Sequence, residues 1–183
     1  MEKKRCFWVD LSSPVYIEYH DKEWGIPVYD DEKLYEMFLL ETFQAGLSWI
    51  TILKKREFFR EAFDGFDVKK IAAYGTEKVE ELMQNPQIIR NRGKITAAVH
   101  NAAILWTYRR NTDLFPDICG DLRMEDHHQS GRYNSCKDGA VRPYIKGFEE
   151  KRHAVRGSVT IYSYLQAVGV VNDHDKNCFC KDG

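Results

Sequence analysis

Apolar residues recur at helical spacing along most of the chain, and the intervals between these runs hold residues that begin or end helices. Short side chains with an oxygen atom, which favour helix N-termini, stand before several runs, and Pro14 follows Ser13 as proline often does at a first helical position. The pattern predicts helices from Pro14, after Asp30–Asp31, and over about 49–63, 67–74, 76–83, 94–110 and 158–168. Because no alternating strand pattern and no internal repeat occur, the sequence predicts an all-α fold.

A carboxylate lies within one of these apolar faces. Glu41 falls on the same side of its helix as Phe38, and burying a carboxylate is costly unless it has a partner or a ligand. The first fifty residues also hold a concentration of large aromatics, namely Trp8, Tyr16, Tyr19, Trp24 and Trp49. One interpretation is an aromatic core with Glu41 reaching solvent. The other is an aromatic cage around one acceptor, which suits a flat, polar or cationic ligand such as a flipped nucleobase.

Composition narrows the class of protein. The chain has 183 residues, 43% of them apolar, which is enough for one domain with a real core. Its 27 basic and 28 acidic residues nearly cancel, so it is neither disordered nor a polycation that holds nucleic acid by charge alone. No apolar run approaches the roughly 18 residues of a membrane span, and the odd cysteine count without a signal peptide favours a reducing compartment. We therefore expect a cytoplasmic protein without membrane contact.

Cysteine and histidine occur in two pairs near the chain ends. His174 and Cys178 stand four apart, as on one helical turn, and Cys6 and His20 offer a second pair. Two cysteines and two histidines can close a tetrahedral structural zinc site. The alternative is that they are isolated buried thiols and surface histidines.

A local basic stretch, Arg90 to Lys94 around Gly93, precedes the long helix. Backbone N–H groups at such a helix start can bind phosphate, although charges at helix ends are often only solvated.

Four long strings in this sequence resemble those of the bacterial 3-methyladenine DNA glycosylase I (Tag) family. The strings are P-V-Y-I-E-Y-H-D-K-E-W-G-I-P from Pro14, E-T-F-Q-A-G-L-S-W-I-T-I-L-K-K-R from Glu41, I-I-R-N-R-G-K-I from Ile88 and V-V-N-D-H-D-K-N-C from Val170. The resemblance covers about residues 5–115 and 157–180, and it implies a helix-hairpin-helix glycosylase fold in which one zinc ion joins the two chain ends.

The resemblance also implies a role for each matching residue. The zinc ligands would be Cys6, His20, His174 and Cys178. The catalytic carboxylate would be Glu41, and the base-binding residues would be Trp8, Tyr16, Tyr19, Trp49 and Ser163. The residues on DNA would be Gly46, Leu47, Arg90, Arg92, Gly93 and Lys94.

The implied activity is base-excision repair: a monomer flips 3-methyladenine out of alkylated double-stranded DNA and hydrolyses its N-glycosidic bond. An inactive DNA-binding relative held together by zinc and a helical interaction domain are the alternatives.

The segment from about 117 to 156 does not fit this single glycosylase domain of residues 1–183. It has neither helical nor strand periodicity, and some forty such residues are unusual inside a domain. Back-translating 117–127 with suitable codons and dropping two bases gives Y-M-W-R-F-A-D-G-R-P, and dropping one base from 141–156 gives S-D-R-I-S-K-D-L-K-K-S-G-M-R-F-V. Both strings resemble the family, so our hypothesis is that this segment is translated out of frame. An uninterrupted coding frame found on resequencing would contradict it.

Overall fold

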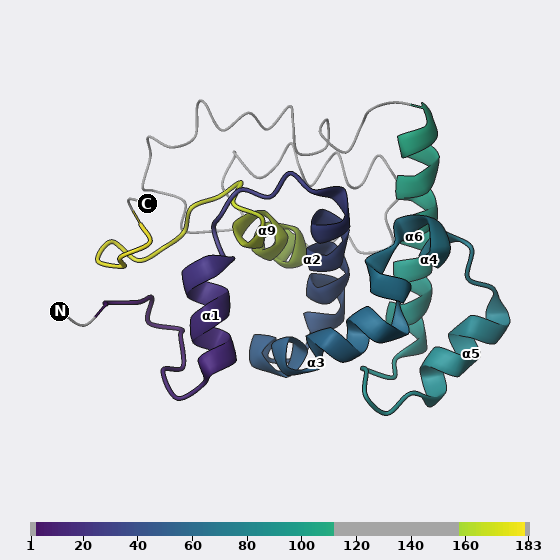
Figure 1. Cartoon of the computed structure of the whole chain (residues 1–183), viewed down its shortest axis with the longest axis horizontal. Coiled ribbons are helices and arrows are strands. Elements are labelled where there is room, and N and C mark those ends of the chain that lie inside the picture. The colour runs from purple at the N-terminus through teal and green to yellow at the C-terminus, as the bar shows by residue number, and fades with distance from the viewer. Residues whose placement is uncertain (1–2, 112–157, 182–183) are drawn as a thin grey trace.

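The described residues of this computed structural model, 3–111 and 158–181, form helices and turns, and no strand occurs among them. The α-helices are α1 (Pro14–Lys22), α2 (Asp31–Gln44), α3 (Trp49–Ala62), α4 (Val68–Ala72), α5 (Thr76–Gln84), α6 (Arg92–Asn111) and α9 (Ser158–Ala167). A short 3-10 helix, η1 (Asp64–Phe66), joins α3 to α4. The predicted all-α class and the order of helices are therefore confirmed for this part of the chain (Figure 1).

The predicted helix starts are mostly correct, and at four of them the aspartates cap with their side chains whereas the serines do not. Asp30 accepts the N–H of Lys33 at 2.9 Å, and Asp67 accepts that of Lys70 at 3.1 Å. Ser13 and Ser48 precede α1 and α3 without a capping side-chain bond.

Helix α5 begins at Thr76, and Gly75 is the residue before it. One helix start differs from its predicted position. The long helix α6 begins at Arg92 rather than Lys94, because Asn91 accepts the N–H of Lys94 at 3.0 Å and caps the helix earlier.

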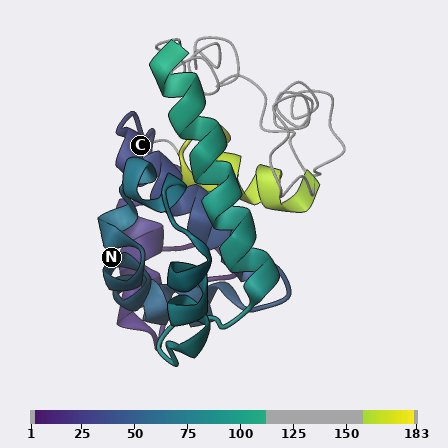
Figure 2. The ribbon, with the colours of Figure 1, turned by 90° about the vertical axis from the view of Figure 1, so that its right-hand side faces the viewer.

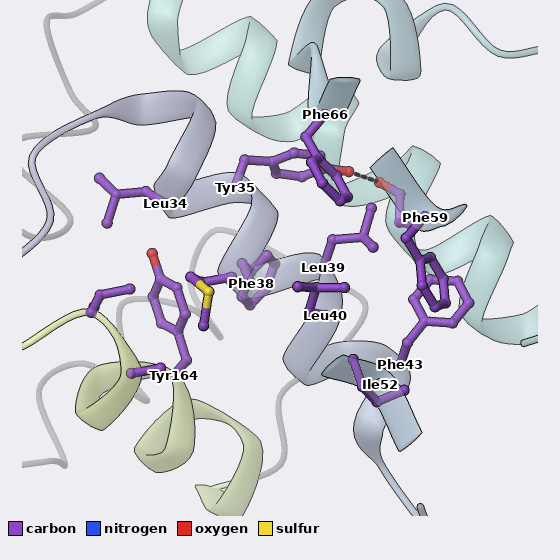
Figure 3. Close-up of a cluster of buried hydrophobic side chains, with 14 of the residues drawn as sticks. Leu34, Tyr35, Phe38, Leu39, Leu40, Phe43, Ile52, Phe59, Phe66 and Tyr164 are labelled. Atoms are coloured by element: carbon purple, nitrogen blue, oxygen red, sulfur yellow. Dashed lines mark hydrogen bonds between the residues drawn. The ribbon is translucent and has the colours of Figure 1, made fainter. Parts of the chain in front are cut away.

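Helix α2 is the centre of the molecule, and every residue from Leu34 to Phe43 is buried. Figure 3 shows Tyr164 of α9 beside Leu34 and Phe38, and Phe59 of α3 beside Phe43 at the other end of the helix. Because α2 is buried on all sides, Glu41 on this helix is enclosed as well.

The long helix α6 packs against another side of α2, and α4 and α5 pack against α6 (Figure 2). Its apolar residues at helical spacing, Ile95, Ala98, Ala102 and Leu105, are all buried, and Val99 beside them is partly buried. The start of α6 consequently lies near the end of α2.

The C-terminal segment returns to the N-terminal segment, as the yellow and purple ends in Figure 1 show. The N–H of Phe179 donates to the carbonyl of Lys4 at 3.0 Å. Gly169 follows the end of α9 with a φ of +77°, and a Cβ there would lie 2.4 Å from the carbonyl carbon of Ile26. Only glycine permits this close approach between the end of α9 and the chain before α2.

The segment 117–156 lies outside the described residues, so the out-of-frame hypothesis and the single-domain boundaries stay predictions. Within the part that is described, none of the helices combines the length and the apolar character needed to cross a membrane.

Candidate active site and metal centre

A cavity of about 360 Å³ opens between α1, the ends of α2 and α9, the start of α3 and the two terminal segments. Its lining residues are Phe7, Trp8, Tyr16, Tyr19, Trp24, Glu41, Gln44, Trp49, Ser163, Gln166, Asp173 and Asp175. The structure thus brings Glu41 together with all five side chains that were predicted to bind a base. They come from four separate parts of the sequence.

Glu41 is enclosed at the cavity wall, with only 4% of its surface exposed. No residue of the described ranges donates a hydrogen bond to its carboxylate, and burial raises its pKa to about 8. A carboxylate in this state is stabilised by any ligand that brings hydrogen-bond donors or positive charge. The interpretation in which Glu41 reaches solvent is therefore wrong.

Two aromatic pairs form the cavity walls. Trp8 and Tyr16 have ring centroids 5.3 Å apart, and Tyr19 and Trp49 are also 5.3 Å apart. The indole Nε1 of Trp49 is fully buried, and it has no hydrogen-bond partner among the described residues. These rings offer flat apolar surfaces on which a planar ligand can stack.

Two further carboxylates line the same cavity, and the sequence analysis missed both. Asp173 accepts hydrogen bonds from Gln166 at 2.6 Å and from Tyr162 at 2.9 Å, and Asp175 accepts the N–H of Phe7 at 2.8 Å. They directly flank a predicted metal ligand, and that adjacency was the available signal. With Glu41, the cavity holds three carboxylates and, among the described lining residues, no lysine or arginine.

Behind the cavity wall, Cys6, His20, His174 and Cys178 are all buried, and their ligand atoms lie within 4.8 Å of one another. Three separations between sulfur and nitrogen are 3.4, 3.4 and 3.5 Å: Cys6 Sγ to His174 Nδ1, Cys178 Sγ to His20 Nε2, and Cys178 Sγ to His174 Nδ1. A tetrahedral zinc ion with ordinary bond lengths would separate sulfur and nitrogen by about 3.5 Å. The cluster can hold a metal ion, and the alternative of isolated thiols and surface histidines is wrong.

The groups around the cluster orient its donors. His20 Nδ1 lies 2.9 Å from Asp21 Oδ1, which leaves Nε2 facing the sulfurs, and Arg5 holds Asp21 through two hydrogen bonds. His174 Nε2 lies 3.2 Å from the carbonyl of Trp24. Each histidine therefore turns its other nitrogen toward the common centre, as metal-binding histidines do.

One part of the prediction for this cluster is wrong. The segment from His174 to Cys178 is not helical but forms irregular turns, in which the N–H of Cys178 donates to the carbonyl of Asp175. The side chains of His174 and Cys178 converge because this turn folds back on itself.

The remaining predicted residues lie together at one end of α2 and α6. Gly46, with a φ of +79°, and Leu47, which is 37% exposed, form the turn after α2. Arg92 and Gly93 are exposed at the start of α6. Arg92 forms two hydrogen bonds to Glu80, at 2.6 and 2.7 Å.

Two lysines and an arginine near this turn differ in their partners. Lys94 donates its ammonium hydrogens to the carbonyls of Phe43 and Ala45, and burial lowers its pKa. Arg90 is exposed, and no described residue pairs with it. Lys55, which the sequence analysis did not single out, donates to the carbonyl of Gln87 at 2.6 Å.

The described residues combine helices, an acidic aromatic cavity and a buried cysteine–histidine cluster, an arrangement that suits a helical protein with a planar, cationic ligand. The family model of methyladenine glycosylases matches residues 8–181, so the chain belongs to this family. DNA-3-methyladenine glycosylase 1 of Escherichia coli (strain K12) is 40% identical over 185 residues, covering 98% of both chains. DNA-3-methyladenine glycosylase of Haemophilus influenzae is 38% identical and covers 97% of both chains.

Solved structures agree with this assignment. A crystal structure of 3-methyladenine DNA glycosylase I (TAG) is 41% identical, covers 97% of this chain and 99% of its own, and superposes with a TM-score of 0.87. A variant of a 30% identical TAG, solved in complex with 3-methyladenine, covers 97% of both chains with a TM-score of 0.85.

Proposed function

We propose that this protein removes 3-methyladenine from alkylated double-stranded DNA by hydrolysing the N-glycosidic bond, leaving an abasic site. The observation that carries the proposal is the cavity with three carboxylates, aromatic walls and no lysine or arginine among its described lining residues. Such a cavity favours a planar cation over a neutral base. The named activity of the relatives at 38–40% identity supports the same reaction.

The chemistry follows from the charge of the base. Methylation at N3 makes adenine cationic, so the bond to the sugar is already weakened and the base leaves readily. Glu41 accepts hydrogen bonds from the N–H edge of the base and stabilises its positive charge while water attacks C1′ of the sugar. Trp8, Tyr16, Tyr19 and Trp49 stack on the base, and Ser163 closes the pocket from α9. Discrimination against adenine comes from the charge that only the methylated base carries.

DNA lies along the end of the molecule where α2 ends and α6 begins. Leu47, carried by the Gly46 turn, enters the gap left by the flipped nucleotide. The backbone N–H groups at the start of α6, around Arg92 and Gly93, hold a phosphate, and the exposed Arg90 guanidinium binds the DNA backbone beside them. The protein acts as a monomer, because one chain supplies the pocket, the Leu47 turn and the α6 start.

The metal in the cluster is zinc, and its role is structural. Two thiolates and two imidazoles complete a tetrahedral shell and leave no open position for a substrate. When bound, the ion joins the N-terminal segment with Trp8 to the C-terminal segment with Asp173.

The test is release of free 3-methyladenine from N-methylated duplex DNA, separated by chromatography. The parent protein should release the base, whereas Glu41→Gln should lower the rate by about 10²–10³-fold, as loss of a group that stabilises transition-state charge does. Binding of methylated DNA without release of base would contradict the proposal and identify an inactive DNA-binding relative. Release of base at the parental rate by Glu41→Gln would contradict the role given to Glu41.

A further inference from the structure

Lys94 reaches from the first turn of α6 to the last turn of α2. Its Nζ donates to the carbonyl of Phe43 at 2.8 Å and to that of Ala45 at 2.6 Å. Carbonyls at a helix C-terminus have no partner within the helix, and the helix dipole makes this end negative. A lysine ammonium is therefore a fitting partner, and the Lys94 side chain is held at the end of α2 by these two carbonyls.

The same carbonyls flank the turn that carries Leu47. The N–H of Leu47 donates to the carbonyl of Gln44 at 2.7 Å, and the Gln44 side chain donates back to the carbonyl of Leu47 at 3.0 Å. Gln44 lies between Phe43 and Ala45, so Lys94 holds the residue to which Leu47 is bound. The turn after α2 is thereby fixed in place although its residues are exposed.

At its other end, Lys94 belongs to the capped start of α6. Its N–H donates to Asn91 Oδ1 at 3.0 Å, and the exposed Gly93 lies between these residues. The backbone of Lys94 is thus part of the helix start, and its side chain is part of the Leu47 turn. One residue joins the two elements that face DNA.

We propose that Lys94 is a positioning residue, which fixes the distance between the α6 start that holds the DNA backbone and the Leu47 turn that enters the duplex, without itself binding phosphate. This inference rests on the proposed function for its DNA geometry. It departs from the sequence-based expectation that Lys94 contacts DNA directly.

The experiment compares Lys94→Met with Lys94→Arg, whose guanidinium can also donate to two carbonyls. Lys70→Met is the control: this exposed lysine of α4 loses the same charge, but its ammonium lies near Asp67 and not at the end of α2 or the start of α6. The probe is a duplex with 2-aminopurine opposite an abasic analogue, because its fluorescence rises when a side chain enters the gap, whether or not a base is excised. Affinity is measured over a range of salt concentrations.

Lys94→Met should lose most of the fluorescence rise, and its excision from methylated duplex should slow by about ten- to a hundredfold, as misplaced catalytic geometry does. Its salt slope for duplex binding and its affinity for free 3-methyladenine should equal those of the parent, and Lys94→Arg should restore the fluorescence. A salt slope lowered by about 0.9 would instead identify Lys94 as a phosphate ligand and overturn the proposal. Loss of free-base affinity in step with excision would do the same, because it indicates general unfolding. A parent protein that gives the fluorescence rise but no excision contradicts the proposed function alone.

Discussion

The cysteine–histidine cluster and the base cavity share a wall but differ in how their polar atoms are satisfied. In the cluster, both histidines have partners on their outer nitrogens, and both sulfurs accept backbone N–H groups, from Asp175 and Cys180. In the cavity, the Glu41 carboxylate and the Trp49 indole N–H have no partner among the described residues. The outer polar atoms of the cluster are therefore satisfied by the protein itself, whereas those of the cavity need a ligand to satisfy them.

This difference separates structure from function in a way that burial alone does not. Both sites are buried, and both contain titratable groups. An unsatisfied buried polar group costs stability, so its presence indicates a ligand that compensates it. A satisfied set of donors around a common point indicates a metal held for stability. Removing the Glu41 charge should therefore raise stability and lower catalysis, whereas removing the metal of the cluster should mainly lower stability.

The largest effect should come from the charge of Glu41. Its pKa of about 8, against an ordinary value of 4.5, means that the unfolded chain ionises Glu41 at lower pH than the folded chain does. The free energy of unfolding of the parent should therefore fall relative to Glu41→Gln between about pH 4.5 and 8, and the difference should level off above pH 8. Excision by the parent should rise over the upper part of this range, as the carboxylate forms.

The measurement is a pair of pH profiles for parent and Glu41→Gln, one of denaturant unfolding and one of single-turnover excision. Parallel stability profiles for the two proteins would show that the Glu41 carboxylate is already compensated in the folded protein. The contrast between the cavity and the cluster would then be wrong.

Metal removal should lower the free energy of unfolding, whereas Glu41→Gln should raise it, and stability is the property on which metal removal mainly acts. At free zinc a hundred times its Kd, binding contributes about 2.7 kcal/mol to the free energy of unfolding, and Cys178→Ser should lose most of this. Cys180→Ser is the matched control, since Cys180 is only partly buried and is not one of the four convergent donors. Thermal unfolding with and without a chelator, and metal content per chain, report the outcome. Equal melting temperatures for the two serine variants would contradict a metal-binding role for Cys178.

Removing an aromatic wall should weaken base binding with little cost elsewhere. Trp49→Ala should lose about 1–3 kcal/mol of affinity for free 3-methyladenine, the usual contribution of stacking on an aromatic side chain. Trp106→Ala is the control, because Trp106 lies on α6 near Lys69 and does not line the cavity. Equilibrium dialysis with labelled base measures both. Similar losses in the two variants would indicate a general packing effect and not stacking.

The smallest effect is expected at Arg90, outside both sites. Arg90→Ala should lower the salt slope of duplex binding by about 0.9, which corresponds to one lost phosphate contact, and should leave the affinity for free base unchanged. Titration of a fluorescent duplex at several salt concentrations gives the slope. An unchanged slope would place Arg90 away from the DNA backbone.

The family resemblance located most of the candidate site, because its matching strings carry the residues themselves. Helical spacing alone placed Glu41 on an apolar face, and the structure has Glu41 at the cavity. Sequence reasoning did not find Asp173 and Asp175, because their role depends on the C-terminal segment folding against the N-terminal one. Likewise, the helical turn expected over His174 to Cys178 was wrong, since long-range contacts hold that segment in irregular turns.

By itself, the sequence determined the helices, the family and the residue types available for a metal and for a cationic base, because these depend on periodicity and on chemistry carried by single residues. Only the tertiary structure decided which polar groups would be satisfied. Glu36, buried at 3% exposure, is neutralised by Arg56 twenty residues away, whereas the equally buried Glu41 on the same helix faces a cavity. Nothing in the local pattern distinguishes these two carboxylates. Their partners come from distant parts of the chain, and partners at that range are set by packing.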